Sequence, residues 1–231
     1  DYLETVDPTV SFSEYAQANP YYRKYNSAGE IEKYLYYPED GINDSSVSNP
    51  LWNAHLNNYN KGQEFGFTNN FIIEWFATHD FRLRAKFGLT KSDDTSDVRL
   101  SPLHSQFDDV SDTEKGLYTH TQTKGLVYEG DLATTFGRLF ADKHMVNAVA
   151  GFNFSSTKRE NYGFSANGFT DDQFDSPSFA NSYPNGESPD YSRTEKRAAS
   201  FYINGGYAYD NRYLLDFNYR SDGASMFGTD N

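Results

Sequence analysis

The sequence predicts an all-β protein, an antiparallel meander of long strands, and three observations support this prediction. Phe and Tyr number 19 each, and aromatic residues reach 17% of the chain while all hydrophobic residues reach only 37%. Apolar and polar residues alternate over long stretches, as in strands with one apolar and one polar face. Short connections between these stretches alternate with very long polar ones. Such a chain can cover the surface of a sheet but has little Leu, Ile or Val for a thick core.

The first predicted hairpin covers about residues 63–90. Its odd-numbered positions from 65 to 75 and from 81 to 89 are mostly apolar, and the positions between them are mostly polar. Pairing Trp75 with Phe81 would place Glu74 opposite Arg82, and opposite charges across two strands stabilise an antiparallel pair. The sequence therefore predicts this register, with one face in an apolar medium and the other in a polar one.

Two further hairpins are expected at about residues 116–155 and 195–221. In the first, the apolar positions are even-numbered, from Leu126 to Phe136 and from His144 to Phe154. In the second they are odd-numbered on both sides of a turn at 210–212, and an Asn in a short connection is common in hairpins. This gives about six long strands in three hairpins.

Long polar segments separate these hairpins, at residues 1–62, 91–115 and 168–193. The first contains Pro8, Pro20, Pro38 and Pro50, which interrupt regular elements. Structureless loops of this length count against a compact soluble domain. Short turns at one end and long loops at the other are typical of outer-membrane β-barrels, where the turns are periplasmic and the loops extracellular. Residues 1–62 are therefore expected to be mostly extracellular loop.

The alternation fits an incomplete segment of a large transmembrane β-barrel, with lipid on the apolar side. Aromatic residues gather beside the three short turns, where an interfacial girdle would lie: Trp75, Phe76, Phe81, Phe136, Phe140, Tyr209 and Tyr213. No stretch approaches the roughly 18 apolar residues of a transmembrane helix. About six strands cannot close a barrel, because the smallest membrane barrels need about eight.

Charge and residue types exclude several kinds of function. The formal net charge of −13 argues against nucleic acid, since binding phosphates needs clustered Lys and Arg. The chain has no Cys, and its five His residues lack metal-ligand spacing. The acidic stretch 93–97 lacks the Gly and the distal Glu of a calcium loop and is expected to be a solvated loop. We expect no catalytic residues, no cofactor and no metal site, and therefore no enzyme.

A set of short motifs runs along nearly the whole chain. They are NPYYRKY from Asn19, NPLWNA from Asn49, SPLH from Ser101, KGLY from Lys115, YEG from Tyr128, HMVNAVAGF from His144, PSFAN from Pro177 and RYLLDFNYRSDGASMFG from Arg212. The ordered set resembles the SusC/RagA family of TonB-linked outer-membrane transporters.

The resemblance implies a barrel of about 22 strands, filled by an N-terminal plug. It also implies a SusD-like surface lipoprotein as partner and oligosaccharide or peptide cargo, imported with energy relayed by TonB. Nothing in the chain matches the plug, so contact with TonB would run through a plug region that is missing from it. The resemblance thus implies an internal barrel segment in the bacterial outer membrane, in contact with outer-membrane lipid.

Two groups of residues are candidates for contact with cargo or partner. The possible lumen-facing group is Glu74, Arg82, Arg84, Lys86, Asp216, Asn218 and Arg220. The possible loop group is Tyr21, Tyr22, Phe179, Tyr183 and Tyr191. Each group has a simpler interpretation: the charges can form a structural ladder against the plug, and the aromatic rings can hold a long loop together.

One alternative comes from a different class of protein. A soluble, secreted β-sandwich could bind carbohydrate through surface aromatic residues. Such a protein would bury Phe71, Leu83, Phe201 and Phe217 against a second layer of the same chain. The exposure of these four side chains therefore separates the two predictions.

Overall fold

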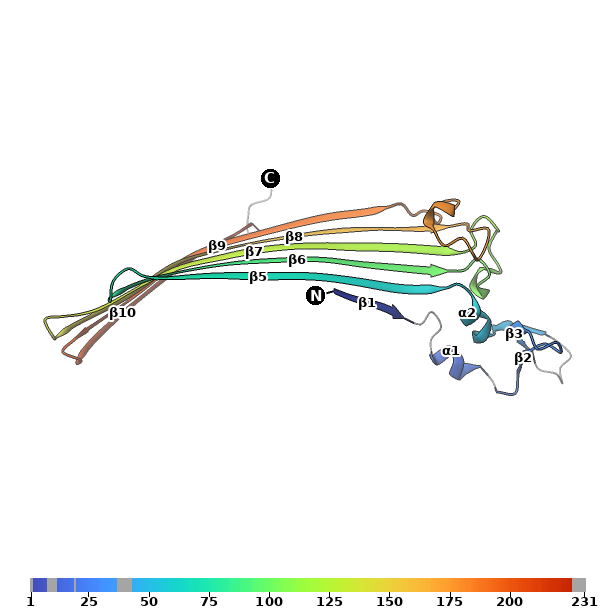
Figure 1. Cartoon of the computed structure of the whole chain (residues 1–231), viewed down its shortest axis with the longest axis horizontal. Helices are drawn as coiled ribbons and strands as arrows, with labels where there is room; N and C mark the ends of the chain where they lie inside the picture. Colours follow the sequence, from blue (N-terminus) through green and yellow to red (C-terminus); the bar gives the residue numbers. More distant parts are fainter. Residues whose placement is uncertain (1, 8–11, 19, 37–42, 226–231) are drawn as a thin grey trace.

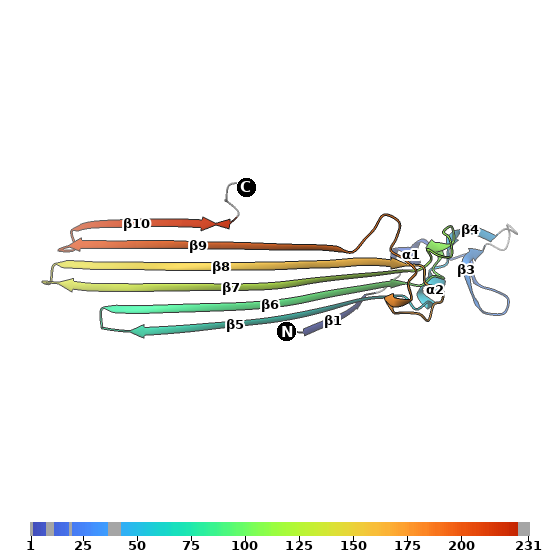
Figure 2. The same cartoon turned by 90° about the horizontal axis from the view of Figure 1, so that it is seen from above.

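The chain forms one long open sheet with a loop-rich cap at one end (Figure 1). The structure is a computed structural model that describes residues 2–7, 12–18, 20–36 and 43–225. Seven antiparallel strands lie in the order β1-β5-β6-β7-β8-β9-β10, and Figure 2 shows them side by side. Their bounds are Tyr2–Asp7 (β1), Tyr59–Phe76 (β5), Phe81–Leu100 (β6), Leu117–Phe140 (β7), His144–Asn167 (β8), Asp190–Tyr209 (β9) and Tyr213–Ala224 (β10). The sheet is not closed, and the predicted all-β meander is confirmed.

The register of the first hairpin differs from the predicted one by two residues. Trp75 pairs with Leu83 rather than with Phe81, and Glu74 lies opposite Arg84 rather than Arg82. The turn lies at His79 and Asp80. On either side of it, Thr78 and Phe81 each donate a 3.4 Å backbone hydrogen bond to the other's carbonyl, so the pairing of the chain continues up to these two residues. A shift of two residues leaves every side chain on its predicted face, since successive residues point to opposite faces.

The strands are longer than the sequence predicted, and part of two expected loops is strand. Residues 91–100 belong to β6, residues 156–167 to β8 and residues 190–193 to β9. The acidic stretch 93–97 is therefore not a loop, and its carboxylates point to different faces. The extension of β6 escaped prediction because both of its faces are polar from Lys91 to Asp97, so the alternation of hydropathy disappears there.

Residues 1–62 also contain more structure than the expected loop. β1 joins the large sheet by pairing with β5. The helices α1 (Phe12–Gln17) and α2 (Pro50–His55) flank a small sheet of β2 (Arg23–Tyr25), β3 (Ile31–Tyr36) and β4 (Asn43–Ser48). Pro8, Asn19, Pro38 and the motif residues 226–228 lie outside the described residues. None of the described helices has the length and apolar character needed to cross a membrane.

Two of the short turns have the geometry of tight β-hairpins. Ala141 and Asp142 have φ of 47° and 54°, and Asp210 and Asn211 have φ of 50° and 53°. Backbone hydrogen bonds of 3.2 Å from Lys143 N to Phe140 O and of 2.9 Å from Arg212 N to Tyr209 O close the turns. Two consecutive left-handed residues define a type I′ turn, whose twist matches that of the paired strands.

The apolar positions of all three hairpins lie on one face of the sheet. One row of paired residues runs from Phe71 through Phe87, Gly130 and Phe154 to Ala199. A Cβ at position 130 would lie 2.2 Å from the Phe154 ring, so the glycine makes room for that ring to lie across the strand. We call this side of the sheet the apolar face and the opposite side the polar face.

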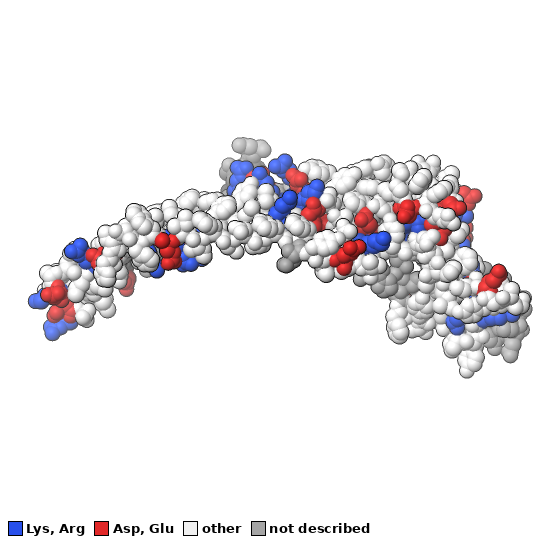
Figure 3. All heavy atoms as spheres, in the orientation of Figure 1, with Lys and Arg blue, Asp and Glu red and all other residues white. Residues whose placement is uncertain are grey.

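No second layer of the described chain covers the apolar face. Phe71 is 58% exposed, Phe201 45% and Phe217 59%, while Leu83 is half-buried between its neighbours in the sheet. Few charged side chains appear on the stretch of sheet between the short turns and the middle of the molecule (Figure 3). The β-sandwich alternative is therefore wrong, because a sandwich would bury these rings.

The buried residues lie instead at the loop end of the sheet. Buried hydrophobic side chains in the described part are Leu35, Tyr118, Ala166 and Phe169. Asn49, Arg99 and Ser101 are fully buried beside them. This region includes α2 and two short 3₁₀ helices, η1 (Ser105–Phe107) and η2 (Pro177–Phe179). The chain therefore has a small, largely polar core at one end of an uncovered sheet.

Candidate functional site

The seven candidate lumen-facing residues all lie on the polar face. Strand register places the even-numbered residues of β5, β6, β9 and β10 on this face. Glu74 and Arg84 form an ion pair of 3.3 Å between Oε1 and Nε. Both side chains are about 38% exposed, so this pair adds little stability. Arg84 therefore lies opposite Glu74 in the place that the sequence predicted for Arg82.

A hollow of about 870 Å³ opens on the polar face and crosses the six strands β5 to β10. Its polar lining is Asn70, Lys86, Glu129, Asp131, Asn153, Ser155, Ser200, Arg220 and Asp222. Arg220 Nε donates hydrogen bonds of 2.9 Å to both carboxylate oxygens of Asp222, which fixes the guanidinium on the sheet. Asn153 accepts a hydrogen bond from Ser200 and donates one of 3.5 Å to Asp131.

The structure brings together some of the candidate residues and separates others. Lys86 and Arg220 line the hollow. Asn218 lines a second, smaller hollow with Arg220. Asp216 lies closer to the short turns, beside Gly206. The hollow also contains Glu129 and Asp131, which sequence reasoning missed although the alternation in β7 places both on this face.

The hollow can hold a polar molecule through hydrogen bonds from several strands. Its lining combines two cations with three carboxylates and four neutral amide or hydroxyl groups. Within the described residues, no group of three or more His, Asp or Glu side chains gathers as metal ligands do. The chemistry that this arrangement supports is recognition of a polar group through hydrogen bonds and charge.

The five candidate loop aromatics lie in separate elements. Tyr21 and Tyr22 precede β2, Phe179 lies in η2, and Tyr183 lies in the segment before β9. The Phe179 ring stacks on Phe174 with 4.7 Å between centroids, so it holds its own loop. Tyr191 is a strand residue of β9 rather than a loop residue. The structure does not gather the five rings into one platform.

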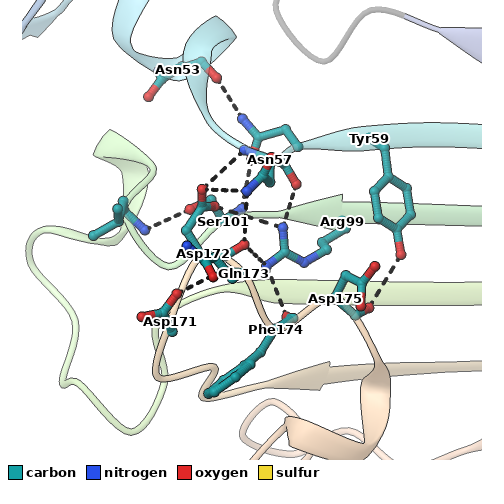
Figure 4. Close-up of polar contacts among 12 residues, drawn as sticks. Asn53, Asn57, Tyr59, Arg99, Ser101, Asp171, Asp172, Gln173, Phe174 and Asp175 are labelled. Carbon is teal, nitrogen blue, oxygen red and sulfur yellow. Dashed lines mark hydrogen bonds and ion pairs between the residues drawn. The ribbon is translucent and has the colours of Figure 1, made fainter.

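Arg99, at the end of β6, connects the loops through hydrogen bonds, and no sequence pattern indicated this role. We define the loop cap as residues 49–58, 99–117 and 167–182. The Arg99 side chain is 0% exposed. Its guanidinium donates to the backbone carbonyls of Asn57, Asp172 (2.8 Å) and Phe174 (2.9 Å), as Figure 4 shows. One cation therefore bridges three segments that are more than 40 residues apart.

Side-chain amides and hydroxyls extend this network through the loop cap (Figure 4). Asn58 Oδ1 accepts a 2.7 Å hydrogen bond from Ser101 N, and Asn57 Nδ2 donates one of 2.9 Å to Asp172 Oδ2. Asn53 contacts Ser105 through two hydrogen bonds of 2.9 and 3.1 Å. Buried polar groups are costly unless they are paired, so these bonds fix the relative positions of the loops.

Backbone contacts join the last two segments of the loop cap. Gly168 and Phe169 both donate through their backbone N–H to the carbonyl of Lys115, at 3.0 and 2.9 Å.

His104 caps η1 by accepting a 3.2 Å hydrogen bond from Gln106 N. Burial lowers the pKa of His104, which favours the neutral ring that can accept this bond. The loops are thus held in one arrangement despite their length.

These features define a segment of β-barrel wall with an organised loop end, and comparisons with known proteins agree. No family model matches the chain. The chain is 25% identical over 249 aligned residues to TonB-dependent receptor P26 of Formosa agariphila, a match that covers 100% of this chain and 22% of the receptor.

Solved structures of the RagAB system have the same fold. The RagAB peptide transporter matches with a TM-score of 0.65 and 16% identity, over 89% of this chain and 22% of that chain. The RagAB peptide importer in its open-open state matches with a TM-score of 0.64 and 17% identity, over 90% of this chain and 22% of that chain. The long meander therefore corresponds to part of the RagA barrel.

The chain is a homologue of TonB-dependent receptors along its whole length. This confirms the resemblance that the motifs indicated. The chain spans about 22% of the length of the relatives that it matches.

Proposed function

We propose that the chain forms barrel wall and extracellular loops of an outer-membrane active transporter. The transporter would import glycans or peptides together with a SusD-like surface lipoprotein. Energy would come from TonB, acting through a plug region. Homology to a TonB-dependent receptor supports the transport class, and RagAB, described as a peptide transporter, provides a precedent for the cargo.

The observation that carries this proposal is the uncovered apolar band. On β5 the band runs from Phe65 to Trp75, which is about 11 residues. At about 3.3 Å per residue and a tilt of about 40°, this length spans roughly 25 Å, the height of the apolar band of an outer-membrane barrel. Exposed apolar rings over such a height would promote aggregation in water, whereas they are stable in contact with lipid.

The aromatic residues beside the short turns support the same orientation. Phe140, His144, Tyr209 and Tyr213 form one row across β7 to β10. The rings of Tyr209 and Tyr213 stack with 6.4 Å between centroids. Tyrosine rings are typical of the membrane–water interface, so the short turns would lie at the periplasmic rim and the loop cap outside the cell.

The two groups of candidate residues have different roles in this proposal. Lys86, Arg220 and the rest of the polar face would line the lumen, where the hollow can receive the plug or cargo. The loop aromatics, including Tyr21 and Tyr183, would face the lipoprotein partner or the incoming cargo. The loop cap would present these rings in a fixed arrangement.

Site-directed spin labelling of the full-length transporter tests the orientation. Nitroxide labels at Phe71, Leu83 and Phe217 should be accessible to oxygen and protected from a water-soluble nickel complex. Labels at Asn70, Arg84 and Asn218 should show the opposite accessibility. The reverse pattern, or equal access of the nickel complex to both sets, would refute the proposed orientation.

A further inference from the structure

On β6 to β9, charged side chains begin on the apolar face next to Leu89, Leu126 and Phe154, while Phe65 and Phe67 of β5 lie in the same rows as these charges. Five of them are basic, and we call them the basic belt: Lys91, Lys124, Lys158, Arg193 and Arg197. Strand register places Lys91 and Lys158 on either side of Leu126 in one row. The next row reads Asp93, Lys124, Glu160 and Arg193 across four strands. The belt therefore crosses β6 to β9 as a continuous surface.

The belt is positively charged in a strongly acidic protein. It contains five cations against three acids, Asp93, Glu160 and Glu195, which leaves two net positive charges. The whole chain carries a net charge of −13. Basic and acidic side chains mix in the middle of the molecule and toward the loop end, as Figure 3 shows. An excess of cations here is thus opposite to the general charge of the chain.

The polar face at the same height has a different composition. Its residues between positions 121 and 127 on β7 are Thr121, Thr123, Gly125 and Val127. At the same height this face has two cations, Arg159 on β8 and Lys196 on β9, and two acids, Glu64 on β5 and Asp94 on β6. If both faces of the sheet met only water at this height, charged residues would be expected equally on both. The concentration of charge on one face indicates that this face meets a charged environment.

The ion pairs within the belt leave part of its charge uncompensated. Glu195 is surrounded by Arg197, Lys158 at 3.9 Å and Arg193 at 4.0 Å. The Arg193 guanidinium also lies 3.6 Å from Glu160. For Lys91 and Lys124, which are both exposed, the structure records no ion pair with any described residue. These two ammonium groups are free to bind an anion.

The height of the belt matches that of lipid headgroups. Lys91 follows Leu89, the last apolar residue of β6 on the apolar face, by two positions or about 7 Å along the strand. Headgroups occupy roughly 5–8 Å beyond the hydrocarbon on each side of a bilayer. Lys and Arg at this position can extend their charged groups into the headgroup layer while their alkyl stems remain against apolar surface.

We propose that the basic belt binds the phosphorylated headgroups of lipids in the outer leaflet. This inference rests on the orientation proposed above, because only a lipid-facing apolar band places the belt at headgroup height. Lys91 and Lys124 would contact phosphate directly, while Lys158, Arg193 and Arg197 raise the local positive potential. The belt would fix the depth of the barrel and hold a shell of anionic lipid around this part of the wall.

Lipid titration of the full-length transporter in detergent tests the proposal. The probes are diphosphoryl lipid A, dephosphorylated lipid A and inorganic phosphate, with bound lipid counted by native mass spectrometry. The test variant is Lys91→Gln with Lys124→Gln. The matched control is Arg159→Gln with Lys196→Gln, which removes two charges from the polar face at the same height. Neither variant breaks an ion pair of Glu195.

The belt variant should bind diphosphoryl lipid A about 30-fold more weakly than the control, because each basic residue near an anionic surface contributes about a factor of five. Dephosphorylated lipid A should not distinguish the variants. Equal binding by both variants, or equally tight binding of inorganic phosphate, would overturn the inference.

Spin labels at Phe71 and Phe217 in the same samples distinguish a wrong headgroup site from a wrong orientation of the sheet. If the labels contact lipid and the variants bind alike, only the headgroup site is wrong; if they do not, the proposed orientation fails as well.

Discussion

The sheet and the loop cap of this protein are stabilised in different ways. In the sheet, large apolar side chains such as Phe71 and Phe217 are more than half exposed, and order comes from the backbone hydrogen bonds between strands. In the loop cap, Arg99, Asn49 and Ser101 are fully buried, and order comes from side chains that bind backbone groups. A barrel wall takes its apolar environment from outside, whereas its loops must satisfy their own polar groups.

The largest expected effect is the loss of the buried guanidinium in the loop cap. Arg99→Ala would leave the carbonyls of Asn57, Asp172 and Phe174 unpaired in a buried site, at a cost of about 3–5 kcal/mol. Hydrogen exchange of the full-length transporter should show faster exchange in residues 101–116 and 168–182, with the strands unchanged. Arg212→Ala removes an exposed arginine at a short turn and serves as the control. Unchanged exchange in the loop cap would contradict the bridging role of Arg99.

Two adjacent isoleucines test whether the faces of the sheet differ. Ile72 is 52% exposed on the polar face and Ile73 is 51% exposed on the apolar face. Ile73→Arg should destabilise the folded barrel by about 2–4 kcal/mol, because it places a charge in hydrocarbon. Ile72→Arg should cost far less, since its guanidinium would reach water in the lumen.

Urea-dependent folding of both isoleucine variants into lipid vesicles measures this difference. Equal destabilisation by the two substitutions would show that the faces have the same environment, and the proposed orientation would then be wrong.

A smaller effect is expected at Gly168 in the loop cap. Its φ is +80°, and a Cβ there would lie 2.4 Å from the carbonyl oxygen of Thr113. Gly168→Ala should therefore cost about 2 kcal/mol through backbone strain and a clash with main-chain atoms. Gly186→Ala is a suitable control, because Gly186 has φ of +81° but no atom within 4 Å of the added Cβ. Thermal unfolding should show a larger loss for position 168.

The smallest effect is expected at the short turn between β7 and β8. Ala141 has φ of 47°, a conformation that costs an alanine about 1 kcal/mol and a glycine almost nothing. Ala141→Gly should stabilise the hairpin by up to about 1 kcal/mol, measured as a shift in the urea midpoint. A loss of stability instead would mean that the methyl group makes a contact that outweighs the strain.

The difference between the sheet and the loop cap also explains which features could be predicted from the sequence. The faces of β5 to β10 were predictable because alternation with period two is a local signal and one face is apolar. The Asp93 region of β6 was mistaken for a loop because both of its faces are polar above the apolar band. The role of Arg99 was not predictable, since its partners are carbonyl oxygens of residues 42 to 75 positions away. Carbonyl oxygens have no residue type that a sequence pattern could reveal.

The length of β7 has a mechanical consequence for the proposed transporter. Leu126, at the edge of the apolar band, lies nine positions after Leu117, where the strand begins, a rise of roughly 30 Å along the strand. These residues form a stiff collar between the fluid bilayer and the loop cap. Changes in bilayer thickness act on the part of a strand that lies in hydrocarbon. The collar would therefore keep such changes from altering the arrangement of the loop cap.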